Sequence, residues 1–273
     1  MPSLTRYVGV GLLLIAAACG SDTTGTGGST SGTVDVRLTD APSDDFESAT
    51  IFVSQVSLQP GDGNASAVIV SNTKASFDLL TLQNGVTAEL GQNSVPTGSY
   101  SQIRLIVDSA RVVLKSGNTF ADGSTTAILR VPSGSESGLK VNFSGPVTVT
   151  SGQTVLMVDF DLSQSFVFQG PPSRPNSVLL KPVIHATALN VAASVSGTVT
   201  PLTSGAQVFA ISGTDTVQTA FANATTGAYT LSFLPPGNYV VAAKATGFQV
   251  TVSAAITLGN SQNLTGIDLL LLP

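Results

Sequence analysis

The chain has no tryptophan, one cysteine and one histidine. Because Cys19 is the only cysteine, no disulfide can form within the chain, and the folded state must rest on the burial of apolar side chains. His185 cannot by itself build a histidine-rich metal site. Four tyrosines and no tryptophan leave few aromatic platforms of the kind on which sugars stack. These absences exclude a disulfide scaffold and a histidine-rich metal centre, and they count against a carbohydrate-active enzyme.

Charged residues are also scarce, at 10% of the sequence, and acidic side chains outnumber basic ones by 16 to 11. A formal net charge of -5 provides no basic surface for nucleic acid. Hydrophobic residues make up 42% of the chain, yet no long stretch has them at the i, i+3, i+4 spacing of an amphipathic helix. A chain rich in valine, serine, threonine and glycine favours β-sheets whose exposed faces carry hydroxyl groups rather than charges.

The N-terminal segment has the layout of a secretory signal peptide. Arg6 supplies a positive charge, residues 7–18 form an apolar run too short to span a bilayer, and Ala16 and Ala18 suit a cleavage site. The end of the run resembles the lipobox of bacterial lipoproteins, which implies that the chain is cut before Cys19 and that this cysteine carries lipid, palmitate included. The lipobox prefers leucine where Ala16 stands, and an ordinary A-x-A cleavage is the alternative.

Residues 20–32 are almost entirely glycine, serine and threonine, and they contain no apolar residue. Such a segment is typical of a flexible tether, and a chain of this length has a root-mean-square reach of roughly 20 Å. Gly20 rather than aspartate follows Cys19. By resemblance to the sorting rule of enterobacterial lipoproteins, this implies the outer membrane of the cell envelope.

From residue 33 the hydrophobic pattern changes to a period of two. Val34, Val36 and Leu38 alternate with polar residues, which indicates a strand with one buried face. The same reasoning predicts further strands at residues 49–58, 68–70, 77–80, 102–107, 111–114, 128–131, 139–143, 147–149, 155–162 and 178–189. Residues 44–48 are the best place for a short helical turn.

The clearest strand pattern lies at residues 155–162. Leu156 and Phe160 point to one side of this strand, and Asp159 and Asp161 point to the other. We therefore expect a central strand with an apolar face in the core and a polar face in contact with water.

After residue 193 the charge almost vanishes, and only Asp215, Lys244 and Asp268 remain. This change indicates a second domain. Its predicted strands are residues 195–199, 207–211, 229–234, 239–245, 250–256 and 267–272. The sequence Pro-Pro-Gly-Asn at residues 235–238 is typical of a turn.

Two sets of motifs carry resemblances to known families. The first set is Leu38-Thr39-Asp40-Ala41-Pro42, Gly98-Ser99-Tyr100, Val131-Pro132-Ser133-Gly134, Asp159-Phe160-Asp161-Leu162 and Lys181-Pro182-Val183-Ile184. In this order they resemble the bacterial lipoprotein family catalogued as domain of unknown function 4382. The second set is Gly205-Ala206-Gln207-Val208, Leu234-Pro235-Pro236-Gly237-Asn238-Tyr239 and Ala245-Thr246-Gly247-Phe248. These motifs resemble the carboxypeptidase regulatory-like, transthyretin-type sandwich, which implies a structural or recognition module.

The sequence thus predicts an all-β protein in four parts. Residues 1–18 are a lipoprotein signal peptide, and residues 19–32 are the lipidated cysteine and its tether. Residues 33–192 form an antiparallel β-sandwich or barrel of unknown function. Residues 193–273 form a smaller transthyretin-like β-sandwich.

Candidate sites rest on clusters of acidic residues. Asp40, Asp44, Asp45 and Glu47 crowd one segment, and hard oxygen ligands at this density suit Ca²⁺. Because the EF-hand spacing is absent, a solvated turn is the preferred interpretation and calcium is the alternative. Asp159 and Asp161 share a strand face at roughly 7 Å, a separation compatible with two-carboxylate hydrolysis, but a solvated sheet face is the preferred interpretation. His185 has no recognisable nucleophile motif beside it and is interpreted as an ordinary sheet residue.

We therefore expect a non-enzymatic, lipid-anchored envelope protein with a structural, adhesive or ligand-binding role. Its expected partners are the membrane, through the N-terminal lipid, and an envelope protein or polysaccharide. The alternatives are a calcium-dependent binding module that uses Asp40, Asp44 and Asp45, and a hydrolase that uses Asp159 and Asp161.

Overall fold

The computed structural model describes residues 31–41, 43, 45–62, 65–83, 85–131, 137–171, 174–203 and 205–273. Within these ranges the helical segments are one 3-10 turn, η1 (Leu79–Leu82), and one α-helical turn, α1 (Leu162–Ser165), and all other regular structure is strand. The prediction of an all-β protein is confirmed. No helix in this part of the chain is long and apolar enough to cross a membrane.

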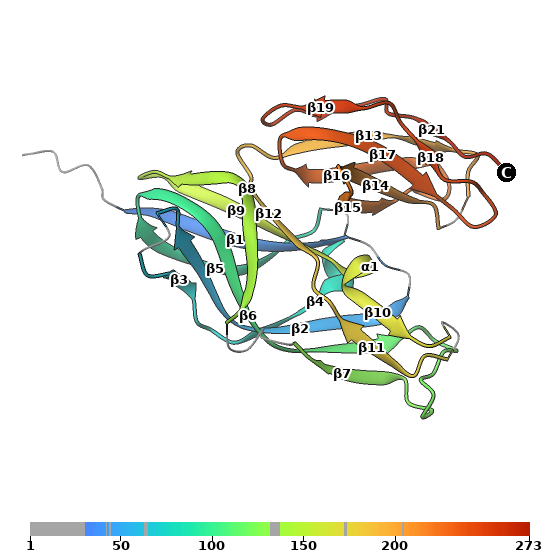
Figure 1. Ribbon diagram of the computed structural model, residues 1–273, viewed down its shortest axis with the longest axis horizontal. Helices are drawn as coiled ribbons and strands as arrows, with labels where there is room; N and C mark the ends of the chain where they lie inside the picture. Colours follow the sequence, from blue (N-terminus) through green and yellow to red (C-terminus); the bar gives the residue numbers. More distant parts are fainter. Residues whose placement is uncertain are drawn as a thin grey trace, which may run out of the picture.

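Two β-bodies make up the structure, a larger one coloured blue to yellow and a smaller one coloured orange to red in Figure 1. The strands of the larger body are β1 (Ser31–Ala41), β2 (Phe46–Pro60), β3 (Val68–Ser71), β4 (Ala75–Asp78), β5 (Ala88–Pro96), β6 (Gly98–Leu114), β7 (Thr126–Arg130), β8 (Leu139–Val149), β9 (Gln153–Asp161), β10 (Phe166–Gln169), β11 (Ser177–Leu180) and β12 (Ile184–Ala188).

These strands form two main sheets and one hairpin. The first sheet has the order β12-β9-β1-β5, and the second has the order β3-β2-β6-β7, with β4 added to β2 and β8 added to β6. β10 and β11 form the hairpin. Most neighbours are antiparallel, but β1 and β9 run parallel, so the first sheet is mixed. β9 lies between β12 and β1, which confirms that the strand predicted at residues 155–162 is central.

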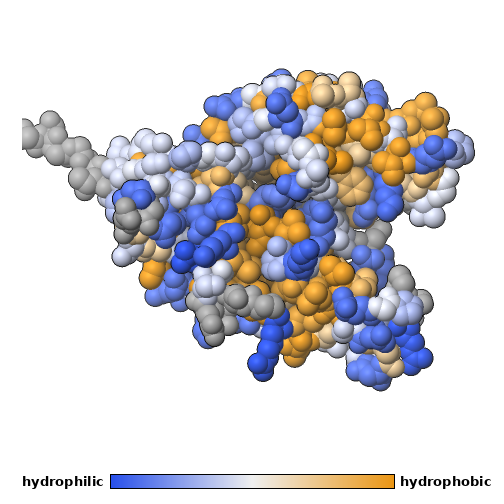
Figure 2. Space-filling view, in the orientation of Figure 1, coloured by the Kyte–Doolittle hydropathy of each residue, from blue (hydrophilic) through white to orange (hydrophobic). Residues whose placement is uncertain are grey.

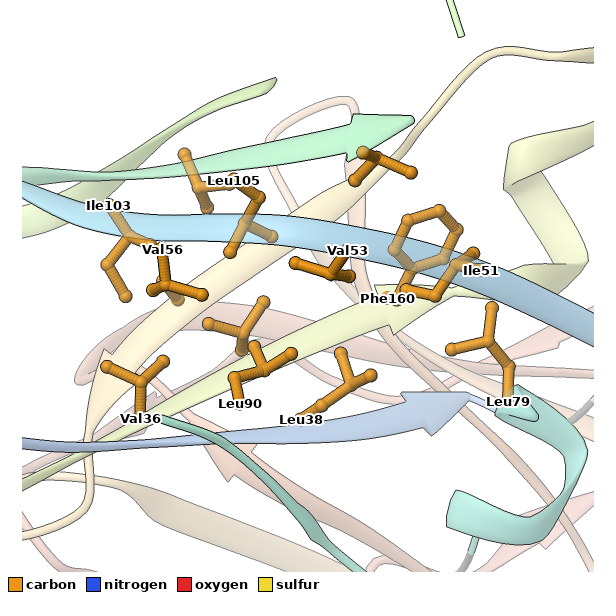
Figure 3. Close-up of a cluster of buried hydrophobic side chains, with 14 of the residues drawn as sticks. Val36, Leu38, Ile51, Val53, Val56, Leu79, Leu90, Ile103, Leu105 and Phe160 are labelled. Carbon is orange, nitrogen blue, oxygen red and sulfur yellow. The ribbon is translucent and has the colours of Figure 1, made fainter. Parts of the chain in front are cut away.

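The core of the larger body lies between its two sheets. Val36 and Leu38 of β1 and Phe160 of β9 face Ile51 and Val53 of β2 (Figure 3), and all five side chains are almost fully buried. Burying a side chain of this kind stabilises the folded state by roughly 1.5–3 kcal/mol. The period-two pattern of β1 and β9 therefore places one face of the first sheet in the core. The other face of the sheet points away from this core.

The two sides of this sandwich differ. At one side β5 meets β3 closely: a Cβ on Gly91 would lie 2.4 Å from Cβ of Ser71, and Nδ2 of Asn93 donates to the carbonyl of Ile69 at 3.0 Å. At the other side β8 and β12 lie near each other but are not paired. β8 bulges there, because residues 143–146 have no register partner on β6.

The smaller body follows directly after residue 192. Its strands are β13 (Ala193–Thr200), β14 (Gln207–Ser212), β15 (Asp215–Phe221), β16 (Ala228–Leu234), β17 (Gly237–Lys244), β18 (Thr251–Val252), β19 (Ile256–Leu258), β20 (Asn263–Leu264) and β21 (Leu269–Leu270). One sheet has the order β16-β13-β20 with β21 also on β13, and the other has the order β15-β14-β17-β18 with β19 also on β17. A separate apolar cluster that includes Val195, Leu231 and Val241 lies within this body.

Several predicted strands have different limits in the structure. β2 begins at Phe46, so the helical turn expected at residues 44–48 is wrong over the part that the structure describes. The strand predicted at residues 178–189 is two strands, because Pro182 has no backbone N–H and the N–H of Val183 donates to Oγ of Ser165 at 2.9 Å. The sequence analysis missed β5, β10, β15 and β20.

Candidate functional site

The polar face of β9 carries the two carboxyl groups that the sequence analysis singled out. Leu156, Val158 and Phe160 of β9 are fully buried in the core, so Asp159 and Asp161 project from the opposite face of the sheet. The expectation that this face meets water is wrong, since Asp159 is only 5% exposed and Asp161 is 0% exposed. Another part of the chain must cover them.

The cover is the smaller body. β15 contacts β9 and β1, and Oγ1 of Thr219 donates to Oδ2 of Asp161 at 3.3 Å. Figure 1 shows β15 and β16 on the side of the smaller body that faces the first sheet. We call this contact region the polar junction, and it consists of Met157, Asp159 and Asp161 of β9, His185 and Thr187 of β12, Val217, Gln218 and Thr219 of β15, and Phe233 of β16.

Asp161 is well supplied with hydrogen-bond donors. Its Oδ1 accepts from Oγ of Ser163 at 2.6 Å and from the backbone N–H of Gln164 at 3.1 Å, and its Oδ2 accepts from Nε2 of Gln164 at 2.7 Å. The side chain therefore caps α1 as well as accepting from β15. These donors provide hydrogen bonds to both oxygens of a carboxyl group that is buried beneath the smaller body.

Asp159 is in the opposite situation. Neither of its carboxyl oxygens has a hydrogen-bond partner among the described residues. Burial, followed by the negative charge of Asp161, raises the pKa of Asp159 well above the ordinary value, while the nearby amide of Gln218 acts in the other direction. That amide also donates to the carbonyl of Ser232 at 3.0 Å, within the smaller body. Asp159 is therefore a carboxyl group that this environment favours in its protonated, neutral form.

His185 lies directly opposite Asp159 in the antiparallel register of β12 and β9. Burial lowers the pKa of His185, and the charge of Asp161, the backbone of Thr216 and the charge of Asp215 oppose that shift in part. Within the described chain, Nε2 of His185 is buried without a hydrogen-bond partner. The register thus places an imidazole and a carboxyl group with unsatisfied atoms side by side at the polar junction.

A small cavity of about 10 Å³ lies between these groups, lined by Asp159, His185 and Phe233 among others. This volume is at the lower limit for one water molecule. Phe233 has a positive φ of 60°, a conformation that non-glycine residues seldom adopt. The backbone at this contact is therefore held in a costly conformation by its surroundings.

A larger groove opens at the unpaired side of the sandwich. It has a volume of about 420 Å³ and lies between the bulge of β8, the edge of β12, the Pro235-Pro236 turn and Asn260. An adjoining pocket of about 180 Å³ shares Ser144 and Ala186 with the groove and extends to His185. The described residues that line the groove carry no charged side chain, so nothing in its chemistry selects one class of ligand. It does give solvent a route toward His185.

The hydrolase alternative required a cleft at Asp159 and Asp161. The structure instead seals both carboxyl groups under the smaller body, next to a cavity that no sugar or peptide substrate can enter. A substrate could reach them only if the smaller body left the sheet.

Of the three predicted calcium ligands, the structure describes Asp40 and Asp45. Asp40 is 4% exposed, and its Oδ1 accepts from the backbone N–H of Leu162 at 3.0 Å. Asp45 is exposed, and its N–H donates to Oγ of Ser43. Asp44 lies outside the described residues. Over the ranges that the structure covers, no three histidine, cysteine, aspartate or glutamate side chains group together as metal ligands.

Cys19 and the rest of the predicted signal and tether up to residue 30 also lie outside the described residues.

Sequence reasoning did not find the β15 side of the polar junction. A signal for it existed: Ser212 pairs with Asp215 across Gly213 and Thr214, and Gly213 has φ 63°. A two-residue loop with glycine at its first position is typical of a β-hairpin. This hairpin would have predicted β15.

Comparison with protein families now assigns both bodies. The family described as Domain of unknown function (DUF4382) matches residues 31–182, and the Carboxypeptidase regulatory-like domain matches residues 194–271. The chain belongs to the DUF4382 family, and its smaller body is a carboxypeptidase regulatory-like domain.

Comparison with curated protein sequences found no similar protein. Among solved structures, the Bacillus anthracis TIE protein is similar at 9% identity and a TM-score of 0.25, covering 89% of this chain and 34% of that protein. This chain thus spans about a third of the TIE protein. The major pilin protein (T-13) from Streptococcus pyogenes serotype GAS131465 is similar at 10% identity and a TM-score of 0.19, covering 88% of this chain and 95% of the pilin.

Proposed function

We propose that the chain is a non-catalytic, lipid-anchored protein of the bacterial cell envelope. In this proposal Cys19 carries the lipid, the anchor lies in the outer membrane, and the smaller body adheres to an envelope protein or polysaccharide. The apolar run at residues 7–18 that ends at Cys19 supports the anchor. The glycine-rich tether supports a folded part held clear of the lipid headgroups.

The observation that carries the adhesive role is the position of the smaller body. The blue start of β1 and the marked C-terminus lie toward opposite ends of the long axis in Figure 1. An anchor that precedes β1 therefore leaves the far end of the smaller body directed away from the membrane. The burial of Asp159 and Asp161 under this body supports a structural role for these two carboxyl groups.

An exposed aliphatic strip marks that far end. Val250, Val252, Leu270 and Leu272 are each more than half exposed, and the segments that carry them meet where the N–H of Gln249 donates to the carbonyl of Leu272 at 2.7 Å. Figure 2 shows apolar surface in orange toward this end of the smaller body. Grouped exposed aliphatic side chains are typical of surfaces that bind a partner.

The anchor is tested by replacing Cys19 with serine. We expect Cys19→Ser to abolish incorporation of labelled palmitate and to move the protein from the detergent phase to the aqueous phase. Ser21→Ala, a change next to the proposed lipid site, is the matched control and should label like the native chain. Outer-membrane placement is read from the density-gradient fraction that holds the labelled protein. Unchanged labelling or partitioning of Cys19→Ser would contradict the proposal.

The adhesive surface is tested with envelope fragments that have been stripped of the native protein. Val252→Thr together with Leu270→Thr should reduce cosedimentation of the purified protein with these fragments. Ile128→Thr removes a side chain that is 74% exposed on the larger body and should leave cosedimentation unchanged. Equal binding by all three proteins would count against the strip as the adhesive surface.

A further inference from the structure

Asp159 and His185 form a cross-strand pair in the polar junction. Their positions are direct partners in the register of β9 and β12, and both side chains project from the sheet face that the smaller body covers. Paired residues on one face of an antiparallel pair have Cβ atoms about 4.5–5.5 Å apart. The two groups are therefore close enough for the protonation of one to affect the other.

The polar neighbours of this pair, the amide of Gln218 and the backbone of Thr216, leave several of its atoms without a hydrogen bond. Both oxygens of Asp159 and Nε2 of His185 lack hydrogen-bond partners within the described residues, and all three atoms are buried. The cavity between the pair and Phe233 has room for one water molecule at most. A charge on Asp159 would thus be poorly solvated for as long as the smaller body stays in place, and a charge on His185 would meet solvent only through the adjoining pocket of about 180 Å³.

The charged groups on the surrounding elements do not compensate for a net charge on the pair either. The charged groups on the elements around the pair are Asp161 on β9, the Arg37–Asp35 ion pair and Asp40 on β1, Asp215 on β15, and Lys140 on β8. Of the two cations, Lys140 is exposed, and Nε of Arg37 binds Oδ2 of Asp35 at 3.0 Å. β16 contributes Ser232 and Phe233, which do not titrate.

We propose that Asp159 and His185 together hold a single proton, and that the smaller body stays docked on the first sheet only while the pair holds that one proton. Loss of the proton leaves a carboxylate buried beside Asp161 without donors. Gain of a second proton leaves a partly buried imidazolium, with its Nε2 unpartnered, facing a neutral acid. Either state is better solvated when the smaller body leaves the sheet, because water then reaches the pair.

The direction of the pH dependence follows from the two pKa shifts. The raised pKa of Asp159 gives a contribution to docking that is complete at low pH and is lost as pH rises. The lowered pKa of His185 gives a contribution that is complete above its ordinary pKa and is lost as pH falls. When undocked, the two side chains titrate near their ordinary values of about 3.9 and about 6.5.

Between those two values the undocked pair also carries one proton, so docking does not change with pH. Above about pH 6.5 undocking releases the proton, and the docking equilibrium constant falls by up to about tenfold per pH unit until the docked pair loses its own proton. Below about pH 3.9 undocking takes up a second proton, and docking weakens as pH falls further.

A thiol reporter at the polar junction measures this equilibrium. Thr187→Cys in a full chain that also carries Cys19→Ser places a thiol at a position that is 7% exposed next to His185. The rate at which this thiol reacts with the neutral reagent 4,4'-dithiodipyridine is divided by the rate for an unstructured thiol peptide at the same pH. This rate ratio removes the effect of the titration of the thiol itself. The ratio should rise by up to about 100-fold between pH 6.5 and pH 8.5.

Charge-neutral variants separate the two members of the pair. With Asp159→Asn the ratio should stay constant above pH 6.5, because no proton remains to be lost. With His185→Gln the rise should begin near pH 4 instead. Asp122→Asn, at an exposed loop position far from the polar junction in sequence, is the control and should follow the native profile.

A second reporter, Val158→Cys, distinguishes undocking from unfolding, because Val158 is fully buried in the core of the larger body. Its reaction ratio should stay flat while that of Thr187→Cys rises. A flat Thr187→Cys ratio between pH 6.5 and 8.5, an Asp159→Asn profile identical to the native one, or an equal rise at Val158→Cys would each overturn the proposal. Should Asp159→Asn fail to fold, the pH at which the Thr187→Cys rate ratio begins to rise in His185→Gln tests the proposal instead. A rise that begins at the same pH as in the native pair would overturn it.

Discussion

Replacing Phe160 with alanine tests whether β9 organises the core of the larger body. Phe160 is fully buried, and its ring lies beside Ile51 of the opposite sheet (Figure 3). Removing a buried phenylalanine side chain costs about 3–5 kcal/mol, because apolar burial is lost and a cavity remains. For a domain of this size such a loss lowers Tm by roughly 10 °C.

The matched control is Phe52→Ala on β2. Phe52 is 36% exposed, so its replacement should cost about 1 kcal/mol. Urea denaturation followed by circular dichroism, with the two variants compared at unchanged m-value, gives the difference in the free energy of unfolding. The structure would be refuted at this point if Phe160→Ala cost no more than Phe52→Ala.

Two further predictions concern other contacts. Gly197→Ala should destabilise the smaller body by about 1–3 kcal/mol, because the new Cβ would lie 2.0 Å from the carbonyl oxygen of Ile267. The control is Gly259→Ala, whose new Cβ would meet only a side-chain oxygen at 3.5 Å. Calorimetry should show a lower unfolding temperature for Gly197→Ala than for Gly259→Ala. Asp40→Ala should lower the free energy of unfolding by about 1–3 kcal/mol, because the buried N–H of Leu162 loses its acceptor. Urea denaturation at pH 7 measures this loss, and an unchanged midpoint would contradict the hydrogen bond.

Much of the larger body is predictable from sequence because its strands alternate strictly. The pattern around Phe160 identified β9 as a central strand, and the pattern from Val34 to Leu38 identified β1. The ends of the strands were harder to predict, since Pro182 divides the strand predicted at residues 178–189 only through its missing N–H. Periodicity reports which residues share a face, and it does not report where hydrogen bonding stops.

The environment of Asp159 and Asp161 could not be predicted in the same way. An alternating strand shows that one face is polar, but whether that face meets water depends on surfaces far apart in the chain. Here the cover comes from β15, whose threonines and glutamine gave a weak strand pattern, and the contact joins Asp161 to Thr219. His185 was interpreted as an ordinary sheet residue because its pairing with Asp159 depends on a register that the sequence alone does not set.

The bulge in β8 bears on how copies of this protein behave at high concentration. A bare strand edge is a template on which another chain can extend the sheet, and long straight edges promote aggregation. Ser144, Gly145 and Pro146 interrupt the edge of β8, and Pro146 has no N–H to offer an incoming strand. Neighbouring copies at high concentration would therefore find no continuous row of backbone hydrogen-bonding groups on β8, although β8 and β12 are not paired on that side of the sandwich.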